Sequence, residues 1–187
     1  TTTVLSQKFA AQSDFAAATT TGSFQDTSLK WGPSPSGVRL QYASGGSDGG
    51  SDGCLLVTGR SAWGDSARIR FMASQVRAGH TYRLSVKLKN GDGSKGLYLT
   101  PTVSLYGAKT SGSGVTYPSV SEFLPQGCDL GRDNAANKTG WVQYTSTFSV
   151  TEDKDAGKVT LSGFGGGAQV AGCDLGYVVL EFFFVTP

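Results

Sequence analysis

The sequence predicts an all-β fold, and three observations support this prediction. Glycine is unusually common, at 27 of 187 residues, and together with Ser, Thr and Asp it separates short apolar runs of strand length. One run alternates with a period of two, because Tyr82, Leu84, Val86 and Leu88 fall on one face and polar residues fall between them. The best helical window, residues 7–18, lacks a sustained three-to-four spacing of apolar positions and ends in a run of threonines.

The expected strands follow one another along the chain, with turn-rich segments between them. They cover residues 38–42, 54–58, 67–72, 81–89, 97–106, 141–150, 158–164 and 178–185. About eight short strands are enough for two packed antiparallel sheets, so we expect a two-sheet β-sandwich. A chain of 187 residues with 38% hydrophobic composition can bury one sizeable core, and residues 1–187 are therefore predicted to form a single domain.

Two segments interrupt the succession of strands. Residues 44–53 are rich in Gly, Ser and Asp, and residues 107–137 are expected to form a long loop near a sheet rim. Loops of more than about fifteen residues are uncommon in compact domains unless they have a function or are disordered. The second segment, which contains Tyr117, is therefore of functional interest.

The overall charge argues against two classes of partner. A net charge of +2 and a pI near 8.4 are too mild for a nucleic-acid-binding protein, which concentrates Lys and Arg on one face. No run of eighteen apolar residues is present, so no membrane span is expected. Arg83, Lys87, Lys89 and Lys95 crowd one strand and its turn, which leaves a polyanionic ligand open beside the simpler interpretation of a solvated sheet face.

The three cysteines allow at most one internal disulfide. The pentapeptide Gly-Cys-Asp-Leu-Gly occurs at residues 127–131 and again at 172–176. This repeat is either a pair of loops joined by a Cys128 to Cys173 bridge, with Cys54 as a buried free thiol, or a coincidence in a glycine-rich sequence. A zinc site is not expected, because the cysteines are isolated and His80 is the single histidine.

Four segments in sequence resemble the β-sandwich carbohydrate-binding modules of families 4, 9, 16 and 22. They are Leu56-Val57-Thr58-Gly59-Arg60 with Trp63-Gly64, then residues 78–85, 140–150 and 177–185. The resemblance implies a jelly-roll that binds a polysaccharide or oligosaccharide in an aromatic-lined cleft without catalysis. It also implies a secreted module, monomeric and tethered to the catalytic domain of a larger enzyme.

Aromatic side chains are the natural candidates for sugar binding. A pyranose ring has apolar C–H faces that stack on Trp or Tyr, while its hydroxyls need planar polar partners. The resemblance places Trp63 in the ligand cleft, although it could instead cap the core at the rim, and it places Trp141 in a structural role. Trp31 lies in a turn-rich segment as either a core plug or a second platform.

The remaining ligand candidates come from the early and middle strands. Arg39 roughly occupies the position of a cleft arginine in family 22, whereas the late-strand glutamate of that family has no counterpart in residues 161–164. Tyr98 and Tyr106 share a strand face if the strand continues past Pro101. The expected ligand-binding set is Trp31, Arg39, Trp63, Tyr98, Tyr106 and Tyr117.

The resemblance further implies a structural calcium ion. Calcium requires several hard oxygen ligands, chiefly carboxylates and backbone carbonyls. Asp52 precedes an expected strand, Glu181 lies in the closing strand, and Asp26 or Asp14 could supply an early carboxylate. The expected metal ligands are therefore Asp26, Asp52 and Glu181.

Two other classes of function share this fold. A jelly-roll polysaccharide lyase or glycosidase needs a pair of carboxylates across a cleft, or a base with a neutralising partner, and no such group is evident in the sequence. His80 lies in a turn, so no catalytic triad is expected there. A structural or adhesion sandwich would have the same fold without an exposed aromatic cleft. The sequence does not indicate which polysaccharide is bound, or whether it is neutral or anionic.

Overall fold

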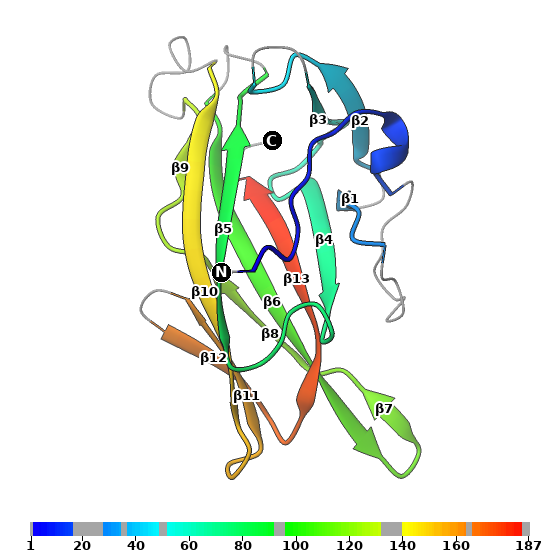
Figure 1. Ribbon diagram of the computed structural model, residues 1–187, viewed down its shortest axis with the longest axis vertical. Coiled ribbons are helices and arrows are strands. Elements are labelled where there is room, and N and C mark those ends of the chain that lie inside the picture. Colours follow the sequence, from blue (N-terminus) through cyan, green and yellow to red (C-terminus); the bar gives the residue numbers. More distant parts are fainter. Residues whose placement is uncertain are drawn as a thin grey trace.

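The computed structural model describes residues 2–16, 28–34, 37–48, 52–91, 96–131, 140–163 and 166–184, and nearly all of its regular structure is β-strand (Figure 1). The helical element in this part of the chain is a single 3-10 turn, Gln12–Asp14. No described helix has the length and hydropathy needed to cross a membrane. The predicted all-β class is confirmed.

The larger sheet is antiparallel and has the order β1-β4-β13-β6-β7, with β8 and β9 also pairing with β6. Its strands are β1 Gly32–Ser34, β4 Ser66–Met72, β6 Tyr98–Ser111, β7 Gly114–Thr116, β8 Ser119–Phe123, β9 Cys128–Asp129 and β13 Asp174–Phe184. The long strands β6 and β13 are paired along most of their length and form the centre of this sheet.

The second sheet has the order β12-β11-β10-β5 and is also antiparallel. Its strands are β5 His80–Leu88, β10 Val142–Asp153, β11 Lys158–Gly163 and β12 Gly166–Ala171. A separate hairpin, formed by β2 Arg39–Ser44 and β3 Gly53–Thr58, lies at the same end of the molecule as the end of β5 (Figure 1).

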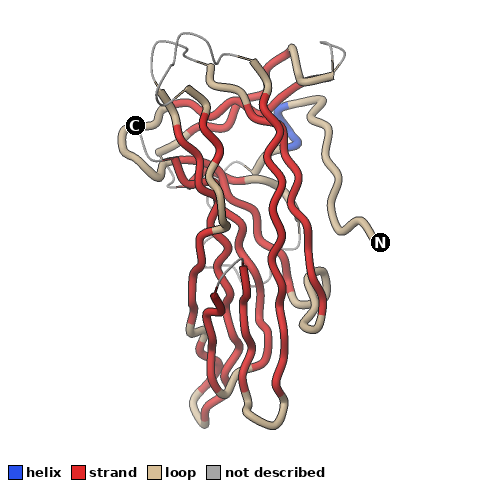
Figure 2. The backbone as a smooth tube through the Cα atoms, turned by 90° about the vertical axis from the view of Figure 1, so that its left-hand side faces the viewer, coloured by secondary structure: helices blue, strands red, loops and turns tan. Residues whose placement is uncertain are grey.

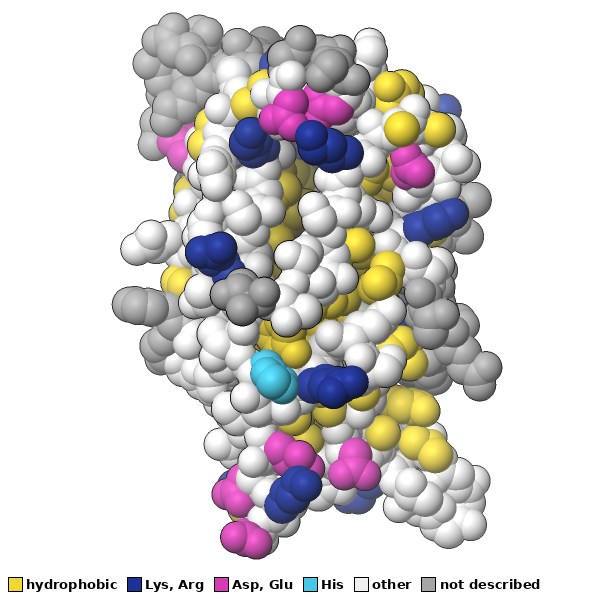
Figure 3. All heavy atoms as spheres, viewed as in Figure 1, with side chains coloured by type: hydrophobic (Ala, Val, Ile, Leu, Met, Phe, Trp, Pro, Cys, Tyr) yellow, Lys and Arg dark blue, Asp and Glu magenta, His cyan; other side chains and the backbone are white. Residues whose placement is uncertain are grey.

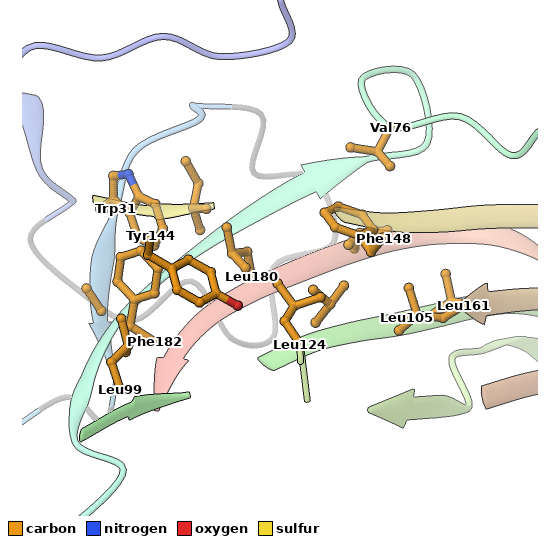
Figure 4. Packing of buried hydrophobic residues seen from close by; sticks show 14 of the residues in the cluster. Trp31, Val76, Leu99, Leu105, Leu124, Tyr144, Phe148, Leu161, Leu180 and Phe182 are labelled. Carbon is orange, nitrogen blue, oxygen red and sulfur yellow. The ribbon is translucent and has the colours of Figure 1, made fainter. Parts of the chain in front are cut away.

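The two sheets pack face to face around one hydrophobic core, as the two layers of strands in Figures 1 and 2 show. Leu105 of β6 and Leu180 of β13 meet Phe148 and Leu161 of the second sheet in this core (Figure 4). The predicted inward face of β5, from Tyr82 to Leu88, packs against the same cluster. The predicted two-sheet sandwich is therefore confirmed.

The expected long loop at residues 107–137 is wrong over most of its length. Strand β6 continues to Ser111 and turns into β7, and β8 and β9 return along its edge. Gly107 is buried within the strand, where an added Cβ would lie 2.7 Å from the Cβ of Cys173, so this glycine permits close packing and does not mark a turn. Residues 132–139 lie outside the described part of the chain.

All three cysteines are free, which excludes the Cys128 to Cys173 bridge in this structure. Cys128 pairs opposite Leu99 of β6, whereas Cys173 packs against Gly107 of the same strand. Eight strand residues separate these two positions, or about 27 Å. A disulfide requires Cα atoms within about 7 Å, so the repeated pentapeptide is not a bridged pair of loops.

Candidate functional site

The outer face of the larger sheet gathers aromatic and charged side chains from strands that are distant in sequence. In β13, Leu180, Phe182 and Phe184 point into the core, so the alternating positions Glu181 and Phe183 point outward. The register places Glu181 opposite Arg68 of β4 and Thr102 of β6, and Thr102 opposite Phe123 of β8. We call this surface the outer face. Its defining residues are Trp63, Arg68, Arg70, Thr102, Tyr106, Tyr117, Phe123, Tyr177, Glu181 and Phe183.

Three aromatic rings form one end of the outer face. Trp63 is 62% exposed and meets the ring of Phe183 edge-on, with a centroid separation of 5.6 Å. Phe123 is 57% exposed and contacts Phe183 from the other side, again edge-on, at 5.7 Å. Exposed aromatic side chains that lie together, and not singly, are typical of interaction surfaces, so this end of the outer face is the candidate site.

The loop that presents Trp63 is fixed to the sheet by its neighbours. Gly64 has φ 87°, a left-handed conformation that favours glycine, and its N–H donates to the carbonyl of Phe184 at 2.7 Å. A Cβ at Gly64 would lie 2.8 Å from the ring of Phe183. Glycine at this position therefore lets the Trp63 turn lie flat against β13.

Asp65 closes the same loop. Its carboxylate accepts hydrogen bonds from the N–H groups of Ser61 and Ala62 at 3.0 and 3.1 Å, and the bond from Ser61 is the main reason that the pKa of Asp65 lies below its usual value. Arg60 donates from Nε to the Asp65 carbonyl at 2.7 Å and stacks its guanidinium over Phe184 at 4.8 Å. The Arg60 to Asp65 segment is thus an ordered support for Trp63.

Polar groups occupy the row next to the aromatic end. Glu181 accepts a hydrogen bond from the hydroxyl of Ser34 at 2.9 Å through Oε1. Arg68 lies directly opposite, half-buried, and its Nε has no hydrogen-bond partner among the described residues. Burial lowers the pKa of Arg68, while Glu181 opposes this change. Across the sheet, this row presents the Arg68 guanidinium, then the Glu181 carboxylate and then the Thr102 hydroxyl.

The opposite end of the outer face is more tightly packed. The Tyr106 ring stacks on the Tyr177 ring with a centroid separation of 4.3 Å, and the Tyr117 ring contacts Tyr177 in a tilted arrangement with a centroid separation of 6.0 Å. The guanidinium of Arg70 lies over the Tyr177 ring at 4.6 Å. Tyr177 is only 4% exposed, and burial is the main reason that its pKa rises to about 12.

The structure brings three of the predicted ligand residues onto the outer face: Trp63, Tyr106 and Tyr117. Trp31 lies in the core, 9% exposed and stacked on Phe182 at 5.0 Å. Tyr98 is half-buried, and its ring packs against the backbone of Gly127.

Arg39 does not belong to the outer face, because it is an exposed residue of the separate β2–β3 hairpin. The sequence interpretation overlooked Arg68, Phe123 and Phe183 as ligand residues. The alternation of core-facing and outward-facing positions could have indicated Arg68, which precedes the buried Ile69 in β4, and Phe183 in the closing strand.

Two of the three expected calcium ligands, Asp52 and Glu181, lie in the described part of the chain, in different parts of the fold. Asp26 lies outside the described residues, Glu181 belongs to the outer face, and Asp52 packs against Gly46 in the loop before β3. Within the described ranges, no group of three or more His, Cys, Asp or Glu side chains could hold a metal ion. The calcium site stays a prediction.

Comparison with known families identifies this architecture. Residues 16–164 match the family described as carbohydrate binding domain, which is 149 of the 187 residues. The chain belongs to this family. It is a carbohydrate-binding domain, and the sequence resemblance to such modules is confirmed.

Two solved structures from Clostridium thermocellum are similar to this carbohydrate-binding domain. One holds the family 22 carbohydrate-binding and catalytic modules of endo-1,4-beta-D-xylanase 10B complexed with xylohexaose, at 15% identity and a TM-score of 0.48, over 83% of this chain and 26% of that one. The other is the C-terminal family 22 module of the same enzyme, at 16% identity and a TM-score of 0.48, over 86% and 88% of the two chains. The domain thus spans about a quarter of the first of these chains. No curated protein matches the sequence significantly.

Proposed function

We propose that this domain binds an extended polysaccharide chain along the outer face, with Trp63 stacking on a sugar ring. The observation that supports this proposal most directly is the 62% exposure of Trp63 beside the rings of Phe183 and Phe123. Partly exposed aromatic rings of this kind can stack on the apolar C–H face of a pyranose ring. The fixed Arg60 to Asp65 loop holds Trp63 in place before the ligand arrives, which lowers the entropic cost of binding.

The polar row supplies partners for the sugar hydroxyls. Arg68 provides planar donors and Glu181 provides acceptors. Glu181 lies two residues before Phe183 in β13, and Arg68 lies opposite Glu181 in β4. From Phe183 to Tyr177 the face extends over six residues of β13, about 20 Å. This length favours a chain of several sugars over a single sugar.

We propose further that the domain acts without catalysis, as a secreted accessory module of a larger carbohydrate-active enzyme. Glycoside hydrolysis uses two carboxyl groups on opposite sides of the scissile bond. In the described cross-strand row, Glu181 faces Arg68 and Thr102 and not a second carboxylate. This arrangement supports recognition of hydroxyls over bond cleavage.

The experiment is affinity electrophoresis against a panel of soluble plant, algal and microbial polysaccharides. We expect at least one polysaccharide to retard the domain, with no release of reducing ends or unsaturated uronate. Glu181→Gln keeps an acceptor for Ser34 but removes the charge, and it should weaken binding about 10- to 100-fold, the effect of one hydrogen bond to a charged group.

The matched control is Glu152→Gln, which removes the same charge from an exposed position of β10 in the other sheet. This variant should bind like the unmodified domain. Equal retardation of all three proteins would place the ligand away from the outer face, and product formation would support a catalytic jelly-roll instead.

A further inference from the structure

A hollow that does not include the outer face lies between the β2–β3 hairpin and the second sheet. It has a volume of about 790 Å³, which is within the usual range for ligand pockets. Its walls are β3, the end of β5 and the segment Gln7 to Phe9, and its floor includes Trp31, Phe182 and Phe184. Figure 3 looks onto this side and shows hydrophobic atoms in a hollow beneath a group of basic and acidic side chains.

The two strands that form the walls face each other without pairing, although the Gly53 N–H at the start of β3 donates to the Phe9 carbonyl at 3.0 Å. Within the described chain, β3 is hydrogen bonded to β2 and β5 to β10, but β3 and β5 are not paired with each other. Backbone N–H and C=O groups along such edges are available to a partner. The hollow thus offers main-chain donors and acceptors on both sides.

Buried polar atoms without partners also cluster around the hollow. Gln7 Oε1 and Asp52 Oδ1 are buried and have no hydrogen-bond partner among the described residues, and both residues line it. Leaving such groups unpaired is unfavourable, so the site suits a ligand with hydroxyl groups.

The charge at the hollow is positive. Its described lining contains four basic residues, Lys8, Arg60, Lys87 and Lys89, and two acidic ones, Asp48 and Asp52, which leaves an excess of two positive charges. Asp48 is already paired with Lys8 and Lys87, at 3.2 and 3.4 Å.

Lys89 places its ammonium group near the ring of Trp141, at 6.0 Å from the centroid, and both residues line the hollow. This pair combines a surface for a pyranose ring with a cation for an attached carboxylate. Lys87 is paired with Asp48, whereas among the described residues Lys89 has no carboxylate within ion-pair distance.

We propose that this hollow is a second binding site, which takes an acidic sugar residue of the uronic acid class. The sugar ring lies against Trp141 and its carboxylate accepts from Lys89. The sugar hydroxyls meet Gln7, Asp52 and the backbone groups at the facing edges of β3 and β5. The site is independent of the outer face, because none of its lining residues belongs to that face.

The test is calorimetric titration of the Trp63→Ala domain, in which the outer face is disabled, with digalacturonic acid as the probe and the neutral disaccharide galactobiose as its counterpart. We expect the acidic disaccharide to bind with a change in the fluorescence of the remaining tryptophans, Trp31 and Trp141, both of which line the hollow. The neutral disaccharide should bind at least about tenfold more weakly, because it lacks the charge-assisted hydrogen bond.

A charge-matched pair of variants in the same background locates the site. Lys89→Gln should weaken binding of the acidic disaccharide about tenfold, whereas Arg83→Gln removes the same charge from an exposed position of β5 that does not line the hollow, and should have no effect. Circular dichroism confirms that both variants fold. The proposal is overturned if the acidic disaccharide does not bind, if it binds only when Trp63 is intact, or if both variants lose affinity equally.

Discussion

Replacing Trp63 by alanine should abolish most polysaccharide binding while leaving the domain folded. Trp63 is 62% exposed, so only about 38% of its surface is in contact with the protein. For a tryptophan of about 250 Å² this contact is about 95 Å², and at about 25 cal/mol per Å² its loss costs at most about 2.4 kcal/mol. In a domain of this size the melting temperature should fall by less than about 10 °C.

The expected effect on binding is larger. Aromatic anchors at the centre of an interface typically contribute 2 kcal/mol or more, so Trp63→Ala should weaken binding at least about 30-fold in affinity electrophoresis or calorimetry. Trp31→Ala is the contrasting variant, because Trp31 is 9% exposed and its truncation in the core should cost about 3–5 kcal/mol. Retained binding in Trp63→Ala, together with a loss of stability like that of Trp31→Ala, would show that Trp63 is a structural residue.

Two further predictions concern pH and metal. Burial raises the pKa of Tyr177 to about 12, so the folded domain keeps a proton on this hydroxyl that the unfolded chain releases near pH 10. The free energy of unfolding should therefore be unaffected by Tyr177 below pH 10 and should fall as the pH rises towards 12. A spectrophotometric titration should show one tyrosine that ionises at higher pH than the others. If a calcium ion is bound by Asp52 or Glu181 in the folded state at about 100 times its dissociation constant, EDTA should lower the melting temperature by about 5–10 °C and added calcium should restore it; an unchanged melting temperature would remove the metal site.

The sequence predicted the sandwich because its strands keep local patterns. The alternation from Tyr82 to Leu88 survives in β5, since one side of this strand faces the core and the other faces solvent. The first and last residues of β4 and β11 also lie within a residue or two of the predicted strand ends. The segment after Gly107 was missed because glycine there is needed for packing against Cys173, and glycine in a single sequence indicates a turn equally well.

The candidate site was harder to predict, because cross-strand register decides it. Arg68, Thr102, Phe123 and Glu181 come from four strands and become neighbours only through the pairing of β4, β13, β6 and β8. The family resemblance implies Glu181 as a metal ligand, because it matches the acidic position of the closing strand. No local pattern states that an arginine more than one hundred residues earlier will lie opposite it.

Strand β13 occupies the middle of the larger sheet although it is the last strand in sequence. It separates β4, at residues 66–72, from β6, at residues 98–111, and hydrogen bonds to both. A nascent chain can form the hairpin β2–β3 early, but the larger sheet remains divided until residues 174–184 have left the ribosome. Folding therefore depends on contacts of long sequence separation, which makes it slow, and a chain released before β13 would expose two apolar strand edges and aggregate.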